Sequence, residues 1–363
     1  MTGSDPATGY PPTGAEGGRL SRPDAKSEPP QSMTTNTRRI LELLLDNLVW
    51  VILIAVLAVF SIFIPNYFQP GIFANIIEAS SVLGVMSIGL ALVIIAGNMD
   101  LSVESVAALS AMTVGILFCS AGIGQGIVLE PQWLAAPVSL FVGVAVGGLV
   151  GAFNGLLIVK VKMNAFIVTL ASYIWVRGLV LAISGGRSAQ DLAPAIRWFG
   201  ITRILGLPIT AWIAILCFIV FSFIMAKTRF GRHLLIIGGN ENAAFRAGIK
   251  VDRILILSFV LAGAIAGLAG WLLVIRTSGA TANLGIGLLF NAFAAVVIGG
   301  ISLKGGVGTL PGVYAGVLLL SAINTAINLM GLPPTSTQLI HGLLVLAAVL
   351  LDAFKLQLRQ KLA

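Results

Sequence analysis

Two acidic residues, Asp100 and Glu104, interrupt an otherwise apolar part of the sequence, within the segment GNMDLSVES at 97–105. A carboxylate inside a membrane costs about 2.5–3.5 kcal/mol on the insertion scale, so it usually faces a cavity or a partner. Asp100 or Ser102 is also suited to accept a backbone N–H at the start of the helix that follows. The segment therefore predicts a capped helix start whose polar groups, including Asn98, line a pathway for a polar solute.

A second group of polar and aromatic side chains lies in or beside apolar runs. An asparagine in such a place either bridges two helices or hydrogen-bonds to a hydroxylated solute. An aromatic ring either stacks on the face of a sugar or contacts lipid at the membrane interface. The members of this group that we predict to face the pathway are Asn164, Phe166 and Asn291.

The sequence lacks the signatures of several catalytic sites. The glycine-rich segment VIGGISLKGGVGT at 297–309 contains no Gly-Lys pair, which a nucleotide-binding Walker A loop requires. His341 has no second His or Glu at metal-ligand spacing, so we expect a core histidine and neither a metal site nor a cofactor. No Gly-x-Ser-x-Gly motif supports a serine hydrolase. We therefore expect the chain not to be an enzyme, and any ATP hydrolysis must come from another subunit.

The composition is that of a membrane protein. Of the 363 residues 57% are hydrophobic and only 10% are charged, whereas soluble domains contain about 25% charged residues. The net charge of +8 is spread between apolar runs instead of clustering on a polar surface, which argues against a nucleic-acid partner. Both cysteines, Cys119 and Cys217, lie inside apolar runs and are expected to be buried thiols.

Ten apolar runs approach the length of about 20 residues that a helix needs to cross a bilayer. Seventeen Lys and Arg residues fall on the segments expected to be cytoplasmic and four on the outer segments. This bias predicts an all-α polytopic membrane protein with about ten transmembrane helices and both termini in the cytoplasm. The second and eighth runs are short, so they are either tilted or broken within the membrane. The runs are 47–64, 82–96, 103–122, 134–159, 165–184, 206–226, 254–275, 288–303, 309–330 and 337–353.

The polar parts of the chain divide it into a tail and a membrane domain. Residues 1–37 are rich in Pro, Gly, Ser and charge, and they predict a disordered cytoplasmic tail before a membrane domain at 38–363. The polar connection at 227–253 is either a docking surface or a solvated turn. Within it Asn240 is suited to cap a short helix at 241–247, and Gly248 is suited to end that helix in a left-handed conformation.

Glycines recur every four residues at Gly143, Gly147, Gly151 and Gly155. Small residues at this spacing let two helices approach closely in lipid. Similar pairs occur at 263 and 267 and at 312 and 316. We interpret these glycines as internal packing surfaces, with a contact to a second copy of the chain as the alternative.

Four segments in order resemble the ribose-type family of ABC transporter permeases. They are GNMDLSV at 97–103, MNAFIVTLASYIWVRGL at 163–179, FGRHLLIIGGNENAAFRAGIKV at 230–251 and VIGGISLKGGVGTLPGV at 297–313. The similarity extends over about 47–353 and leaves only the tail outside. Two positions depart from the family pattern, because Asn98 and Glu104 stand where the family usually has glycine.

The resemblance implies a bacterial inner-membrane permease with about ten helices. It would work as a dimer with a second copy or a sister permease, receive a sugar or polyol from a periplasmic binding protein, and be driven by a cytoplasmic ATPase. An ion-coupled secondary transporter is the alternative, although such proteins normally repeat their ion site, and the carboxylates here are concentrated at one junction. By position, the family's ATPase-docking loop corresponds to Gly239, Asn240, Glu241, Ala243, Ala244 and Gly248.

Overall fold

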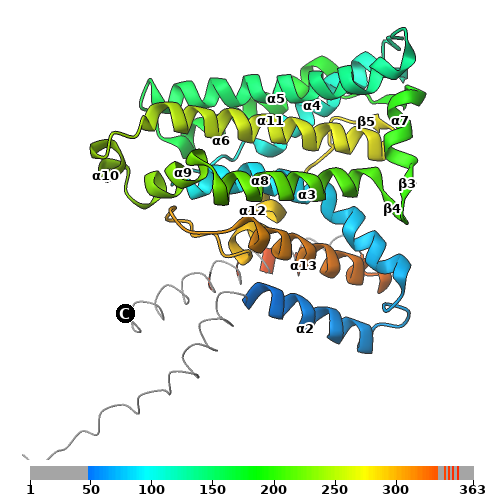
Figure 1. Cartoon of the computed structure of the whole chain (residues 1–363). Helices are drawn as coiled ribbons and strands as arrows, with labels where there is room; N and C mark the ends of the chain where they lie inside the picture. The colour runs from blue at the N-terminus through cyan, green and yellow to red at the C-terminus, as the bar shows by residue number, and fades with distance from the viewer. Residues whose placement is uncertain (1–47, 334–338, 341, 344–345, 347–349, 351–363) are drawn as a thin grey trace, which may run out of the picture. The chain divides into compact units, whose positions relative to one another are not determined.

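The computed structural model describes residues 48–333 and, beyond them, residues 339–340, 342–343, 346 and 350 (Figure 1). The chain divides into two compact units, Met1–Asp46 and Asn47–Ala363, and the description that follows concerns the second. The tail at 1–37, both chain ends, most of the tenth apolar run and His341 lie outside the described residues.

Among the described residues, six helices are long and apolar enough to cross a membrane. Figure 1 shows several of them running alongside one another, with α11 next to α5. The six are α3 (Pro70–Ile95), α5 (Ala135–Val159, entered through the short 3-10 helix Gln132–Leu134), α6 (Ala165–Ser184), α8 (Ile209–Lys227), α11 (Val251–Thr277) and α13 (Leu310–Leu329).

Three further apolar helices are shorter, namely α2 (Leu48–Phe63), α4 (Val103–Phe118) and α12 (Leu288–Ile298). With 11 residues, α12 is about 16 Å long, roughly half of the hydrocarbon core of a bilayer. In the eighth apolar run the helix ends at Ile298, before the glycine-rich residues that follow. Three short polar or amphipathic helices complete the described part: α7 (Pro194–Ile201), α9 (Arg229–Gly239) and α10 (Glu241–Arg246).

The prediction that the second run is short was wrong, because α3 extends over 26 residues from Pro70. The N-terminal half of α3 was not predicted as part of the apolar run because it contains Glu78. This carboxylate accepts a hydrogen bond from the Arg203 guanidinium at 2.9 Å, which offsets the cost of placing it in an otherwise apolar helix. Proline in the first helical turn is compatible with a helix start at Pro70.

The all-α expectation missed two small antiparallel sheets. Strands β1 (Cys119–Gly122), β2 (Ala189–Leu192) and β5 (Gly279–Ala280) form one sheet in the order β1-β2-β5. This sheet joins the end of α4 to the segments that follow α6 and α11. A hairpin of β3 (Arg203–Ile204) and β4 (Leu207–Pro208) forms the other. Strands of two to four residues are too short to show an alternating pattern in the sequence.

The glycine repeat of α5 packs against α11. A Cβ atom placed on Gly147 would overlap the carbonyl oxygen of Gly263 and lie 2.8 Å from the amide nitrogen of Gly267. The two helix backbones are therefore in direct contact, as small residues permit. Gly316 approaches the backbone of Ala295 and Gly299 in the same way. The interpretation of these glycines as internal packing surfaces is confirmed.

Candidate functional site

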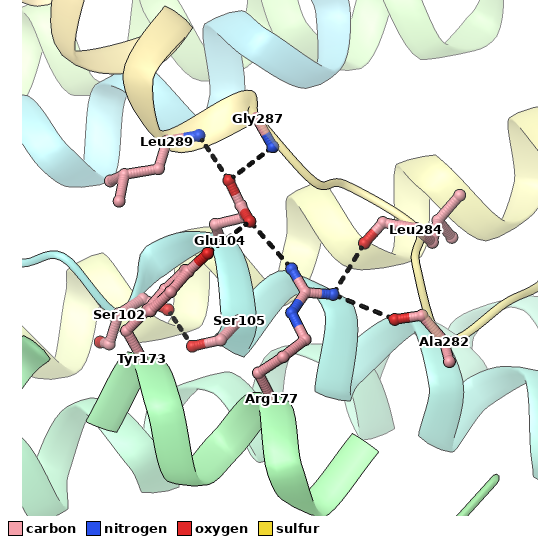
Figure 2. A network of polar contacts seen from close by, with 9 residues as sticks. All are labelled: Ser102, Glu104, Ser105, Tyr173, Arg177, Ala282, Leu284, Gly287 and Leu289. Carbon is pink, nitrogen blue, oxygen red and sulfur yellow. Dashed lines mark hydrogen bonds and ion pairs between the residues drawn. The ribbon is translucent and has the colours of Figure 1, made fainter. Parts of the chain in front are cut away.

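A buried carboxylate joins two short helices that are far apart in the sequence. Glu104 is in the first turn of α4, and its side chain is 1% exposed. Its Oε2 accepts hydrogen bonds from the backbone N–H groups of Gly287 at 3.0 Å and Leu289 at 2.9 Å (Figure 2). These two N–H groups belong to the start of α12, where unpaired donors and the helix dipole favour an anion. Glu104 therefore caps α12 from another part of the chain.

The charge of Glu104 is balanced by Arg177 of α6. An Arg177 Nη2 atom lies 2.9 Å from Glu104 Oε1, and the arginine side chain is only 15% exposed. The other guanidinium nitrogen donates to the carbonyl oxygens of Ala282 at 3.1 Å and Leu284 at 3.3 Å (Figure 2). Because a buried ion pair is tolerated only when its remaining polar atoms are also paired, these contacts fix the segment that enters α12.

A second row of polar groups starts at Asp100. Its Oδ1 accepts the backbone N–H of Ser102 at 2.9 Å and the Ser102 hydroxyl at 2.5 Å. Asn154 of α5 donates to Ser102 Oγ at 3.0 Å and accepts from Ser172 Oγ of α6 at 2.6 Å. The indole N–H of Trp175 donates to Ser172 Oγ at 3.2 Å. The row links the α3–α4 connection to α5 and α6.

The cap predicted at the start of α4 lies in the turn before the helix. Asp100 accepts the N–H of Ser102, which is the residue that precedes the helix, so Asp100 stabilises the turn before α4. The Ser102 side chain makes no cap to the helix itself. Both Asp100 and Ser102 are buried, as polar groups with hydrogen-bond partners can be.

The remaining residues predicted for the pathway lie in different surroundings. Asn98 is half-buried and donates to the carbonyl oxygen of Ala96 at 3.3 Å. Asn291 is half-buried in the first turn of α12, the helix that Glu104 caps. Asn164 is exposed and accepts the N–H groups of Phe166 at 2.9 Å and Ile167 at 3.3 Å, so it is the N-cap of α6. Phe166 is also exposed at this helix start.

Sequence reasoning missed the partners of Glu104 and the place of Asn154 in the polar row. Tyr173 donates to Glu104 Oε1 at 3.5 Å, one helical turn before Arg177. Asn154 is fully buried among the glycines of α5. The available signal was a polar or charged side chain inside an apolar run, which identifies Arg177 and Asn154 as residues that need a partner. Their actual partners come from distant segments.

The polar connection between α8 and α11 contains the short helix predicted there. The Asn240 side chain accepts the N–H of Ala243 at 2.9 Å, and Gly248 has a left-handed φ of 78°. The capping predictions for Asn240 and Gly248 are confirmed, and α10 ends at Arg246. Ala244 is buried within its own chain, whereas the side chain of Phe245 is 74% exposed. The exposed surface of α10 therefore includes Phe245, whereas Ala244 packs against its own chain.

The described residues contain no group of three His, Cys, Asp or Glu side chains placed to hold a metal ion. The two cysteines are free thiols, with Cys119 buried and Cys217 half-buried. The contacts that Glu104 makes in this site are hydrogen bonds and one buried ion pair.

Comparisons with known proteins give consistent matches over most of the chain. A family model described as "Branched-chain amino acid transport system / permease component" matches residues 72–349. The chain is 35% identical over 299 residues to the L-arabinose transport system permease protein AraH of Escherichia coli K12, covering 81% of this chain and 86% of that protein. It is 34% identical over 304 residues to the ribose import permease protein RbsC of the same strain, covering 83% and 91%. RbsC of Bacillus subtilis 168 is 35% identical over 297 residues, covering 81% and 88%. No solved structure gives a significant match.

Proposed function

We propose, from the family of ABC transport permease components to which this chain belongs, that its solute is a monosaccharide or a related polyol. The chain is the permease subunit of an importer and a multi-pass protein of the bacterial inner membrane. The observation that carries the solute class is the identity of 34–35% to ribose and arabinose permeases over more than four fifths of the chain. The family model alone is broader, since its description refers to branched-chain amino acids.

The polar row from Asp100 to Trp175 supports a pathway for a hydroxylated solute. It contains carboxylate, hydroxyl, amide and indole groups of the kinds that bind sugar hydroxyls, and here the Asp100, Ser102, Asn154 and Ser172 side chains are buried and bonded within the row. The row therefore supports the wall of a pathway by holding the α3–α4 connection, α5 and α6 together. We place the translocation pathway beside this row and beside Asn98, Asn291, Asn164 and Phe166. Glu104 contributes indirectly, since it holds the start of α12 together with Arg177.

The importer needs three protein partners, each at a different surface of the permease. A cytoplasmic ATPase subunit docks on α10 and its flanking residues Gly239, Asn240 and Gly248, which correspond by position to the ATPase-docking loop of the family that the sequence resembles. The chain has no Walker A motif of its own, so this subunit supplies the ATP hydrolysis. A periplasmic binding protein delivers the solute at the opposite face. A second permease copy or a sister permease completes the membrane part. The exposed apolar side chains of α8 contact lipid; they include Leu216, Ile219 and Phe223.

Reconstitution in vesicles tests this function. The purified permease is combined with the ATPase subunit and the binding protein of the same transporter, and uptake of labelled ribose, arabinose and leucine is measured with and without ATP. We expect sugar uptake that requires ATP and both partners. Leucine uptake of equal or greater efficiency would contradict the solute class. Uptake driven by an ion gradient with the permease alone would favour the secondary-transporter alternative.

A further inference from the structure

We propose that a glycine junction, formed by Gly97, Gly238, Gly305 and Gly306, transmits movement of α10 to both chain segments that meet at Glu104. This inference rests on the proposed docking of an ATPase at α10. It makes Gly238 a positioning residue for transport, one that contacts neither solute nor nucleotide.

Three backbones meet at this junction without any side chain between them. The Gly306 N–H donates to the carbonyl oxygen of Ile95 at 2.9 Å, joining the connection between α12 and α13 to the end of α3. A Cβ atom on Gly238, in α9, would overlap Ile95 O and lie 2.5 Å from Gly306 N. A Cβ atom on Gly305 would lie 2.7 Å from the Cα of Gly97.

The glycines are required for two separate reasons. Gly97, Gly305 and Gly306 have φ values of 80°, 82° and 74°, a left-handed conformation that residues with a side chain rarely adopt. Gly238 lies in regular helix, so only its contacts with the other two backbones exclude a side chain. Backbones in direct contact cannot absorb a displacement by a rotamer change, so movement of one must move the others.

Each of the three segments leads from the junction to a functional element. Gly238 is followed by Gly239 and by Asn240, which caps α10. Gly97 leads to Asp100 and then to α4, which carries Glu104. The connection containing Gly305 and Gly306 leads back to α12, whose start Glu104 caps.

These contacts and chain connections therefore form a closed path that joins α10, α4 and α12. A displacement of α10 reaches α4 through the end of α3, and it reaches α12 through the connection after α12. These two helices are joined again at their N-terminal ends by the hydrogen bonds of Glu104 to Gly287 and Leu289. The junction is thus placed to move both helices beside the proposed pathway in one step, which is the task of a coupling element.

The test compares Gly238→Ala with Gly71→Ala in the complete complex in vesicles. Gly71 lies in the first turn of α3, and a Cβ atom there would have no neighbour within 4 Å. For Gly238→Ala we expect normal co-purification of the ATPase and normal basal hydrolysis. Sugar uptake and the stimulation of hydrolysis by loaded binding protein should both fall at least about ten-fold, corresponding to roughly 1.4 kcal/mol. Gly71→Ala should match the wild type in all four measurements.

Several results would overturn the inference. Full uptake and stimulation by Gly238→Ala would show that the junction does not transmit movement, while the proposed function would stand. Loss of ATPase binding would place the defect in docking and would equally overturn it. Failure of the wild-type permease to bind an ATPase or to import sugar would instead reject the proposed function.

A second measurement avoids dependence on the folding of the variant. In the wild-type complex, hydrogen exchange of the Gly306 amide reports its hydrogen bond to Ile95 O. We expect binding of a non-hydrolysable ATP analogue to the ATPase to change this exchange rate by about ten-fold, the scale of a local opening altered by roughly 1.4 kcal/mol. An unchanged rate would overturn the inference even if Gly238→Ala does not accumulate in the membrane.

Discussion

The carboxylate of Glu104 lies 2.9 Å from the guanidinium of Arg177, and its other oxygen caps the start of α12. One side chain thus satisfies a buried cation and two backbone donors. The same distance separates Lys160 and Asp252, but the side chains of that pair are 58% and 59% exposed. The two pairs have the same nitrogen–oxygen distance but differ in their exposure to solvent, so they are expected to differ in their contribution to stability.

We predict that Glu104→Ala destabilises the permease far more than Lys160→Ala. Removing Glu104 leaves Arg177 buried without its carboxylate and two N–H groups without an acceptor, and breaking a buried pair costs about 3–5 kcal/mol. Loss of the exposed pair costs roughly 0–1 kcal/mol. Thermal unfolding of the detergent-solubilised variants, followed by tryptophan fluorescence, measures the difference. Equal unfolding temperatures for the two variants would contradict the role assigned to Glu104.

Glu104→Gly tests the same position against the family pattern. The resemblance to the ribose-type family implies a glycine at this position, yet in this chain Arg177 donates to Glu104 and to the carbonyls of Ala282 and Leu284 before α12. We therefore expect Glu104→Gly to reduce uptake unless Arg177 is also replaced, and Glu104→Gly with Arg177→Leu to recover part of the loss. A double variant no better than Glu104→Gly alone would show that the two residues act independently.

Asp100 is expected to tolerate an isosteric amide but not an apolar residue. Asparagine retains an acceptor for the Ser102 N–H and hydroxyl, whereas leucine leaves both without their partner. Asp100→Asn should keep most of the uptake activity, and Asp100→Leu should lose at least about ten-fold, the effect of roughly 1.4 kcal/mol. Uptake is compared at matched membrane expression. Ser110→Ala is the control, since the buried Ser110 hydroxyl finds no hydrogen-bond partner among the described residues. Wild-type uptake by Asp100→Leu would remove the polar row from the pathway.

The features that followed from the sequence are local ones. Asn240, the α10 helix and Gly248 were predictable because a cap, a helix and its stop are set by neighbouring residues. Asp100 and Glu104 were predictable as residues that need partners, because burying a charge in an apolar segment is costly. The partners of Glu104 were not, since Arg177 is 73 positions and Leu289 is 185 positions from Glu104, whereas the partner of Asp100 is Ser102 in the same turn. Such long-range contacts depend on how the helices pack. The pairing of strands β1, β2 and β5 depends on the same packing.

The packing of α5 on α11 predicts different outcomes at two adjacent glycines. A Cβ atom on Gly147 would overlap the backbone of α11, whereas one on Gly148 would have a single neighbour, the Cβ of Ala264 at 3.8 Å. We expect Gly147→Ala to cost about 1–3 kcal/mol of stability, as overpacking does, and Gly148→Ala to be neutral or slightly stabilising. Thermal unfolding in detergent measures both. A Gly147→Ala variant as stable as Gly148→Ala would indicate that the helices separate without cost.

The exposed Phe245 provides the sharpest test of the docking surface on α10. A large aromatic side chain that is 74% exposed on a short helix is a type of residue that is enriched at protein interfaces. Phe245→Ala should leave folding and membrane insertion intact, because the side chain makes little contact within its own chain. It should weaken binding of the ATPase by at least about ten-fold, or roughly 1.4 kcal/mol.

Ala244→Arg is the instructive comparison for Phe245→Ala. Because the methyl group of Ala244 is fully buried, an arginine there disturbs the packing of α10 on its own chain before any partner is involved. We therefore expect Ala244→Arg to lower the unfolding temperature of the isolated permease and Phe245→Ala to leave it unchanged. Unfolding curves of the isolated permease and titration with purified ATPase separate the two effects. Wild-type affinity for the ATPase in Phe245→Ala would place the docking surface outside α10.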